Sequence, residues 1–189
     1  MEDEERHRDL RRFQGLYDAH CGAVVAYAHR RTATPADAQD VVADTFAIAW
    51  RRLSEVPEGD AALPWLYGVA RRVLANQRRG NQRRADLTAR LRGQGSLSPD
   101  VEGQVVAGDE RRTVLAALSR LRPADQEILR LAVWEELPHR DIAGVVGCSE
   151  SSVAVRLHRA RSRLGREIGK EERRVGQETS GGQAEGNDR

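Results

Sequence analysis

The amino-acid sequence predicts an all-α protein made of two small helical domains joined by a flexible linker. Apolar residues recur at spacings of three and four through most of the chain, and no stretch alternates β-branched residues as a strand would. Aromatic residues make up only 4% and charged residues 32% of the 189 residues, so one large hydrophobic core is not expected. The segment 93–108, GQGSLSPDVEGQVVAG, contains four glycines and is where we place the linker.

Two of the predicted helices of the first half are long. The first is expected over residues 9–31, with a possible break at Cys21 and Gly22. Another begins at Leu63 and passes from an apolar stretch into an arginine-rich one, NQRRGNQRRADLTARLR, that is suited to binding phosphate. Trp65 lies at the start of this helix, where it fits either the hydrophobic core or a base-stacking position.

The helix between these two has a strong start signal. Thr34 can cap it, Pro35 suits its first turn, and Asp37 is placed to reach back to the cap. Asp37, Asp40 and Asp44 then follow at spacings of three and four, which puts three carboxylates on one face. This acidic stripe is either a solvated surface or a docking site for a basic partner.

The second half is predicted to contain four helices. One covers about residues 110–121 and the next begins at Pro123. The run 137–164 then divides into two helices, because Gly147 can adopt a positive φ and Ser149 can cap the helix that follows. The second of these helices has one apolar stripe and carries arginines on its other faces, which is typical of a helix-turn-helix that binds DNA.

Other features of the composition exclude several classes of site. Cys21 and Cys148 lack the spacing of a metal site, and no stretch of about 18 apolar residues predicts membrane insertion. The tail 169–189 has few apolar residues and is expected to be disordered. A metal-dependent hydrolase is a weak alternative, because the histidines show no HExxH pattern. The histidines are His7, His20, His29, His139 and His158.

With these segments identified, residues 13–164 resemble the sigma-70 family of bacterial transcription initiation factors, in particular its extracytoplasmic-function (ECF) group. Three stretches carry the resemblance: DAQDVVADTFAIAWRRL at 37–53, LPWLYGVARRVLANQRR at 63–79, and the helix-turn-helix at 137–164. They resemble, in order, the family's polymerase-docking helix, its −10 promoter segment and its −35 reading motif.

The resemblance implies roles for particular residues. Those expected to bind core RNA polymerase are Asp37, Asp40, Asp44 and Arg51. Those expected to bind the −10 element are Trp65, Tyr67, Arg71, Arg72, Asn76, Arg78 and Arg79. Those expected to bind the −35 element are Glu150, Ser151, Ser152, Val155, Arg156, Arg159 and Arg163. A turn at residues 70–72 is further expected to line a pocket for a flipped −10 base.

The resemblance also implies a domain organisation and a set of partners. Region 2 would occupy residues 9–92, the linker 93–108, region 4 residues 109–168, and a disordered tail 169–189. The expected partners are promoter DNA, an anti-sigma factor, and core RNA polymerase through its β′ clamp coiled coil and β flap. The protein is then expected to be cytoplasmic and not an enzyme, with no catalytic residues, metal or cofactor. A stand-alone helix-turn-helix regulator is the alternative, although it leaves the acidic stripe unexplained.

Overall fold

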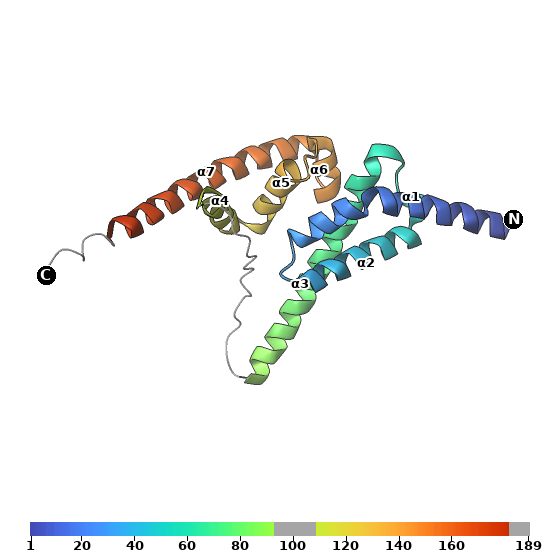
Figure 1. Ribbon diagram of the computed structural model, residues 1–189, viewed down its shortest axis with the longest axis horizontal. Helices are drawn as coiled ribbons and strands as arrows, with labels where there is room; N and C mark the ends of the chain where they lie inside the picture. Colours follow the sequence, from blue (N-terminus) through green and yellow to red (C-terminus); the bar gives the residue numbers. More distant parts are fainter. Residues whose placement is uncertain (93–108, 182–189) are drawn as a thin grey trace. The chain divides into compact units, whose positions relative to one another are not determined.

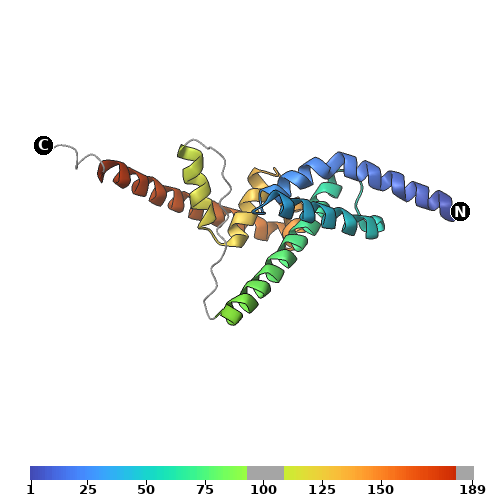
Figure 2. The same cartoon turned by 60° about the horizontal axis from the view of Figure 1, so that its bottom comes forward.

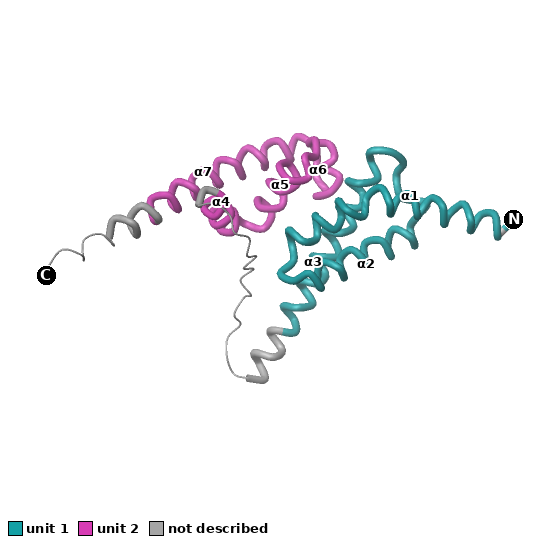
Figure 3. The backbone as a smooth tube through the Cα atoms, in the orientation of Figure 1, with its two compact units in different colours: residues 1–103 teal, residues 104–189 magenta. Residues whose placement is uncertain are grey.

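The computed structural model describes residues 1–92 and 109–181, and every regular element in these ranges is helical. The predicted linker 93–108 and the last eight residues of the predicted tail, 182–189, lie outside the described residues. The chain divides into two compact units, Met1–Gly103 and Gln104–Arg189 (Figure 3). The described part of the chain therefore confirms the all-α prediction.

Three long helices form the described part of unit 1, residues 1–92. The elements are α1 (Glu2–His29), α2 (Pro35–Arg51), the short 3-10 helices η1 (Leu53–Glu55) and η2 (Gly59–Ala61), and α3 (Ala62–Arg92). Each of the three α-helices packs against the other two, and the first turns of α1 extend beyond them (Figures 1 and 2). Val24, Phe46, Ala49 and Leu66 form a buried cluster that joins all three helices.

Helix α1 is continuous, so the expected break at Cys21 and Gly22 is wrong. Gly22 is exposed, Cys21 packs partly against the core, and both lie within the uninterrupted helix Glu2–His29. A single glycine in a helix costs only about 1 kcal/mol relative to alanine, and packing of this long helix outweighs that cost.

A stack of side chains ties the end of α1 to α3. The Arg31 guanidinium lies 3.5 Å from the centroid of the Tyr27 ring, and its Nη1 donates to the Tyr27 carbonyl at 3.1 Å. On the other side, the Tyr27 ring is stacked on Tyr67 with 4.8 Å between centroids. Tyr67 is consequently only 3% exposed.

The start of α2 follows the predicted capping pattern. The Asp37 backbone N-H donates to Thr34 Oγ1 at 3.1 Å, and this hydroxyl donates in turn to Asp37 Oδ2 at 2.7 Å. Pro35 occupies the first turn, where no intrahelical donor is needed. These bonds fix the residue at which α2 begins, and with it the register of the acidic face.

Four helices form unit 2 over its described residues 109–181, as predicted. They are α4 (Asp109–Ser119), α5 (Pro123–Val133), α6 (His139–Val146) and α7 (Glu150–Gly181). Helix α7 packs against each of the other three, and α5 also packs against α6. The core includes Leu131 from α5, Ile142 from α6 and Val153 from α7, all fully buried.

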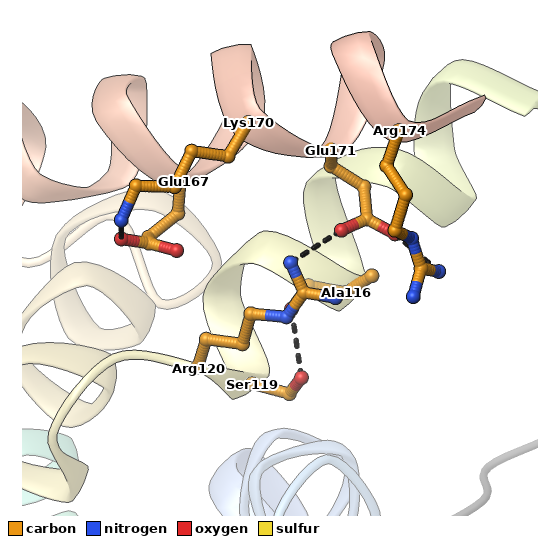
Figure 4. A network of polar contacts seen from close by, with 7 residues as sticks. All are labelled: Ala116, Ser119, Arg120, Glu167, Lys170, Glu171 and Arg174. Carbon is orange, nitrogen blue, oxygen red and sulfur yellow. Dashed lines mark hydrogen bonds and ion pairs between the residues drawn. The ribbon is translucent and has the colours of Figure 1, made fainter. Parts of the chain in front are cut away.

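Helix α7 continues to Gly181, so the expectation of disorder from residue 169 is wrong for residues 169–181. Glu171 is only 3% exposed and lies between two arginines (Figure 4). Its carboxylate is 2.5 Å from Nη1 of Arg120, which directly follows α4, and 2.9 Å from Arg174 Nη2 of α7. A nearby ion pair joins Glu167 and Lys170 at 2.7 Å. An ion pair therefore attaches this part of α7 to Arg120, just after the end of α4.

Candidate nucleic-acid interface

The turn between α6 and α7 has the geometry that its sequence predicts. Gly147 ends α6 with φ 72° and ψ 48°, in the left-handed region that favours glycine. The N-H groups of Gly147 and Cys148 both donate to the Ala143 carbonyl, at 2.9 and 3.1 Å. Ser149 Oγ then accepts from the Ser152 N-H at 3.3 Å and caps α7. Two consecutive hydrogen-bonded ends thus hold α6 and α7 in a helix-turn-helix.

Packing of α7 decides which of its residues remain available. Val153, Leu157 and Ala160 are buried at 0–2% exposure and face the rest of unit 2. The half-buried Ser152 lies 2.8 Å from Ser149 Oγ and so belongs to the cap. The other predicted residues of the first three turns are exposed. They are Glu150, Ser151, Val155, Arg156 and Arg159.

Arg163 differs from these exposed residues. Its Nη1 donates to Asp125 Oδ2 of α5 at 2.5 Å, and the two side chains are 38% and 13% exposed. The structure therefore places Arg163 in a contact within unit 2, not free on the surface with Arg156 and Arg159.

The arginine-rich part of α3 provides a second basic surface. Arg72, Asn76, Arg78 and Arg79 are exposed. Arg79 Nη2 donates to Asn76 Oδ1 at 2.5 Å, and Arg78 Nη2 donates at 3.3 Å to the backbone carbonyl of Arg31 in unit 1. These two hydrogen bonds restrain the guanidinium groups of Arg78 and Arg79 beside the same turn of α3.

The expected turn at residues 70–72 is wrong, because these residues lie inside the continuous helix α3. Ala70 is fully buried and Arg71 is half-buried. The segment therefore does not form the turn that was expected to line a base pocket. Tyr67 is also buried against Tyr27, and its ring has no exposed face on which a base could stack. Trp65 is intermediate: it packs partly against the core, with the Arg52 guanidinium 5.9 Å from its ring.

On α2, Asp40 and Asp44 are exposed, whereas Asp37 is half-buried and bonded to its helix cap. Arg51 is exposed at the last residue of the helix. The three carboxylates lie on α2 as the sequence predicted, but that of Asp37 accepts a hydrogen bond from Thr34.

An aromatic cluster beside this face was missed by the sequence analysis. Trp50 and Tyr17 are 40% and 42% exposed, and their rings lie 5.2 Å from Phe13 and 4.7 Å from Phe46 respectively. The spacing of four between Phe46 and Trp50 is a signal that could have identified it. A hydrogen bond with Cys21 raises the pKa of Tyr17.

Residues 1–92 and the residues of 109–181 that the structure describes contain no group of three His, Cys, Asp or Glu side chains that could hold a metal ion. In the same ranges, none of the helices combines the length and the hydrophobicity that a membrane-spanning segment requires.

Comparison with known proteins identifies both units. Residues 16–84 match the family model described as Sigma-70 region 2, and residues 111–164 match Sigma-70, region 4. The chain is also 32% identical over 148 residues to the RNA polymerase sigma factor NccH of Alcaligenes xylosoxydans xylosoxydans, with 76% of this chain and 80% of NccH covered. The chain belongs to the sigma-70 family. Because both regions occur in one chain, a sigma factor is favoured over a stand-alone helix-turn-helix regulator.

A second relative specifies the group within the sigma-70 family. The ECF RNA polymerase sigma factor SigL of Mycobacterium tuberculosis is 29% identical over 150 residues, which cover 78% of this chain and 83% of SigL. The sigma factor RpoE of Bartonella quintana, solved in complex with the anti-sigma factor NepR, has the same fold. Its TM-score is 0.63 at 23% identity, with 82% of this chain and 96% of RpoE covered. The protein is thus an ECF-type sigma factor, and sigma factors are initiation factors rather than catalysts.

Proposed function

We propose that this sigma factor binds core RNA polymerase through α2 and reads promoter DNA with α3 and α7. The observation that carries the proposal is the exposed N-terminal half of α7, held by the α6–α7 turn with Arg156 and Arg159 on its surface. The helix-turn-helix places such a helix in the major groove, where base edges can be read.

Each exposed side chain on this part of α7 has a chemistry that suits base reading. Arg156 and Arg159 can each donate two hydrogen bonds to the O6 and N7 of a guanine, which is worth about 1–3 kcal/mol of discrimination. Glu150 can accept from the amino group of cytosine, and the methyl groups of Val155, which is 50% exposed, can contact thymine. We therefore assign −35 recognition to these residues and to Ser151.

For α2, the exposed carboxylates of Asp40 and Asp44 are proposed to dock on a basic partner, the β′ clamp coiled coil of RNA polymerase. They stand one helical turn apart, so two cations on one partner helix can pair with them. Asp37 is proposed to support this surface through the cap, and Arg51 to contact the partner at the other end of α2. The exposed Trp50 ring can add apolar contact area beside them.

For α3, Arg72, Asn76, Arg78 and Arg79 are proposed to bind the phosphates and bases of the −10 element. Trp65 is proposed as the aromatic residue at the end of this surface, because part of its ring remains exposed. Arg71 is half-buried and contributes less, and Tyr67 is left out of the −10 assignment.

Four further elements of the proposal concern partners, location and activity. Unit 2 is proposed to contact the β flap of the polymerase, and an anti-sigma factor is proposed to hold the protein inactive. The second point is supported by the complex of the relative RpoE with NepR. The protein is proposed to act in the cytoplasm, where its polymerase and DNA are found, and to have no catalytic activity of its own.

Polymerase binding is tested with charge reversal on α2. Asp40→Lys with Asp44→Lys should abolish capture of core RNA polymerase by the full chain, because two cations would then face a basic partner. Glu5→Lys with Asp9→Lys is the matched control, since both residues are exposed on α1. Equal capture by the two double variants would contradict the assignment of α2.

DNA reading is tested within α7. Arg156→Ala should weaken binding of holoenzyme to a promoter duplex by about 10-fold or more, from the lost bidentate pair. Arg161→Ala is the matched control, because Arg161 is exposed about 140° round the same helix. An equal loss for both variants would show that α7 contributes only general positive charge.

A further inference from the structure

We propose that Asp125 is a positioning residue for promoter reading, because it holds Arg163 away from the DNA and sets the C-terminal limit of the reading face of α7. This inference rests on the proposed function of α7. It concerns a contact between two helices, and it assigns a role in DNA binding to a carboxylate outside the helix-turn-helix.

The register of α7 places three arginines in one row. Arg156, Arg159 and Arg163 follow at spacings of three and four, so they lie along one face of the helix. In the part of the chain that the structure describes, neither Arg156 nor Arg159 has an ion-pair partner. Arg163 continues the same row but is paired with Asp125. The row of free guanidinium groups therefore ends one turn before Arg163.

The geometry of the Arg163–Asp125 pair disfavours a phosphate at Arg163. Arg163 Nη1 lies 2.5 Å from Asp125 Oδ2, and Asp125 is 13% exposed. A charge-assisted bond to a largely covered carboxylate is stronger than one in open solvent. A DNA phosphate would have to displace Asp125 and leave that carboxylate without its cation. Phosphate is thus disfavoured at Arg163 although the residue is 38% exposed.

The same pair links two helices of unit 2. Asp125 is in the first turn of α5, and α5 packs against α7. The bond joins residues 38 apart in sequence, so it restrains how α5 and α7 lie against each other. This one contact therefore helps to keep the face of α7 that carries Arg156 and Arg159 exposed. It also neutralises the charge of Arg163, the next arginine on that face.

This arrangement makes a prediction opposite to that of an ordinary stabilising contact. Asp125→Asn should release Arg163 to a phosphate, so DNA binding becomes tighter and more dependent on salt. One added phosphate contact steepens the slope of log affinity against log salt by about 0.9. Between 50 and 200 mM salt the variant should therefore lose about 3- to 4-fold more affinity than the wild-type chain.

The experiment measures binding of the full chain to a labelled non-specific duplex by fluorescence anisotropy across this salt range. Asp125→Asn should steepen the slope, and Asp125→Asn with Arg163→Ala should restore the wild-type slope. Glu172→Gln is the charge control, because Glu172 is an exposed carboxylate on α7. A wild-type slope for Asp125→Asn, or an equal increase in the Glu172→Gln variant, would overturn the proposal.

Two further variants complete the design. Arg163→Gln should leave the slope unchanged if Arg163 makes no phosphate contact, and a decrease of about 0.9 would overturn the proposal even if Asp125→Asn fails to fold. Arg156→Ala separates this inference from the function on which it rests. If Arg156→Ala lowers affinity while Asp125→Asn does not steepen the slope, only the role of Asp125 fails. If Arg156→Ala has no effect on affinity, the assignment of α7 to DNA fails as well.

Discussion

Replacing Glu171 by glutamine should loosen the attachment of α7 to Arg120, the residue that directly follows α4. Glu171 is 3% exposed, and its carboxylate contacts Arg120 and Arg174. Because glutamine has nearly the same shape as glutamate, the variant loses the charge without leaving a cavity. Glutamine can still accept one hydrogen bond from either arginine. The effect thus isolates the contribution of charge to holding residues 169–181 in place.

The magnitude follows from the exposure of the partners. Breaking a fully buried ion pair costs about 3–5 kcal/mol, whereas a fully exposed pair contributes about 0–1 kcal/mol. Here the carboxylate is buried, but the two arginine side chains are 40% and 59% exposed and can return to water. We expect Glu171→Gln to lower the free energy of unfolding of unit 2 by about 2 kcal/mol.

Hydrogen exchange followed by mass spectrometry measures this change for each unit separately. Amides of α4 and of the core part of α7 should exchange roughly 30-fold faster, whereas α1, α2 and α3 serve as an internal reference. Glu172→Gln is the matched control, because its carboxylate is exposed. The same exchange in both variants would refute the role of Glu171.

Two other predictions concern local structure. Gly147→Ala should destabilise unit 2 by about 1–2 kcal/mol, because alanine is strained at the φ of 72°, and a thermal melt of the full chain measures the loss; an unchanged melt would show that the turn rearranges freely. The hydrogen bond from Arg52 lowers the pKa of Glu55, so a carboxyl titration by NMR should find Glu55 protonating at lower pH than an ordinary glutamate. The stability from this bond is present above the ordinary pKa and is lost as the pH falls through the lowered one. Arg52→Ala should bring the pKa of Glu55 back toward its usual value, and no movement would mean that the pair does not form in solution.

Local sequence signals predicted much of the fold. Thr34 with Asp37, and Gly147 with Ser149, specify helix ends through bonds to residues close by in the sequence, and the structure has each of these bonds or turns. Such short-range chemistry can be read without knowing the tertiary structure. The positions of α2 and of the helix-turn-helix could therefore be predicted.

Contacts between distant residues could not be predicted in this way. Glu171 stands in a polar run that suggested disorder, and its partner Arg120 lies 51 residues earlier in the chain, in the turn after α4. The sequence predicted Arg163 to be a surface arginine that binds DNA, whereas in the structure Asp125 of α5 pairs with it. Tyr67 follows Trp65 by two residues and so points to a different side of α3, where Tyr27 covers it. In each case the tertiary contact decides whether the side chain is available.

Transcription from core RNA polymerase reconstituted with this chain tests the central claim most directly. Mapping of the transcript 5′ ends should reveal a set of start sites that core polymerase alone does not use. The Asp40→Lys and Asp44→Lys double variant and the Arg156→Ala variant should each lose those starts, the first with loss of polymerase binding and the second without it. Start sites that are the same with and without the protein would contradict the account.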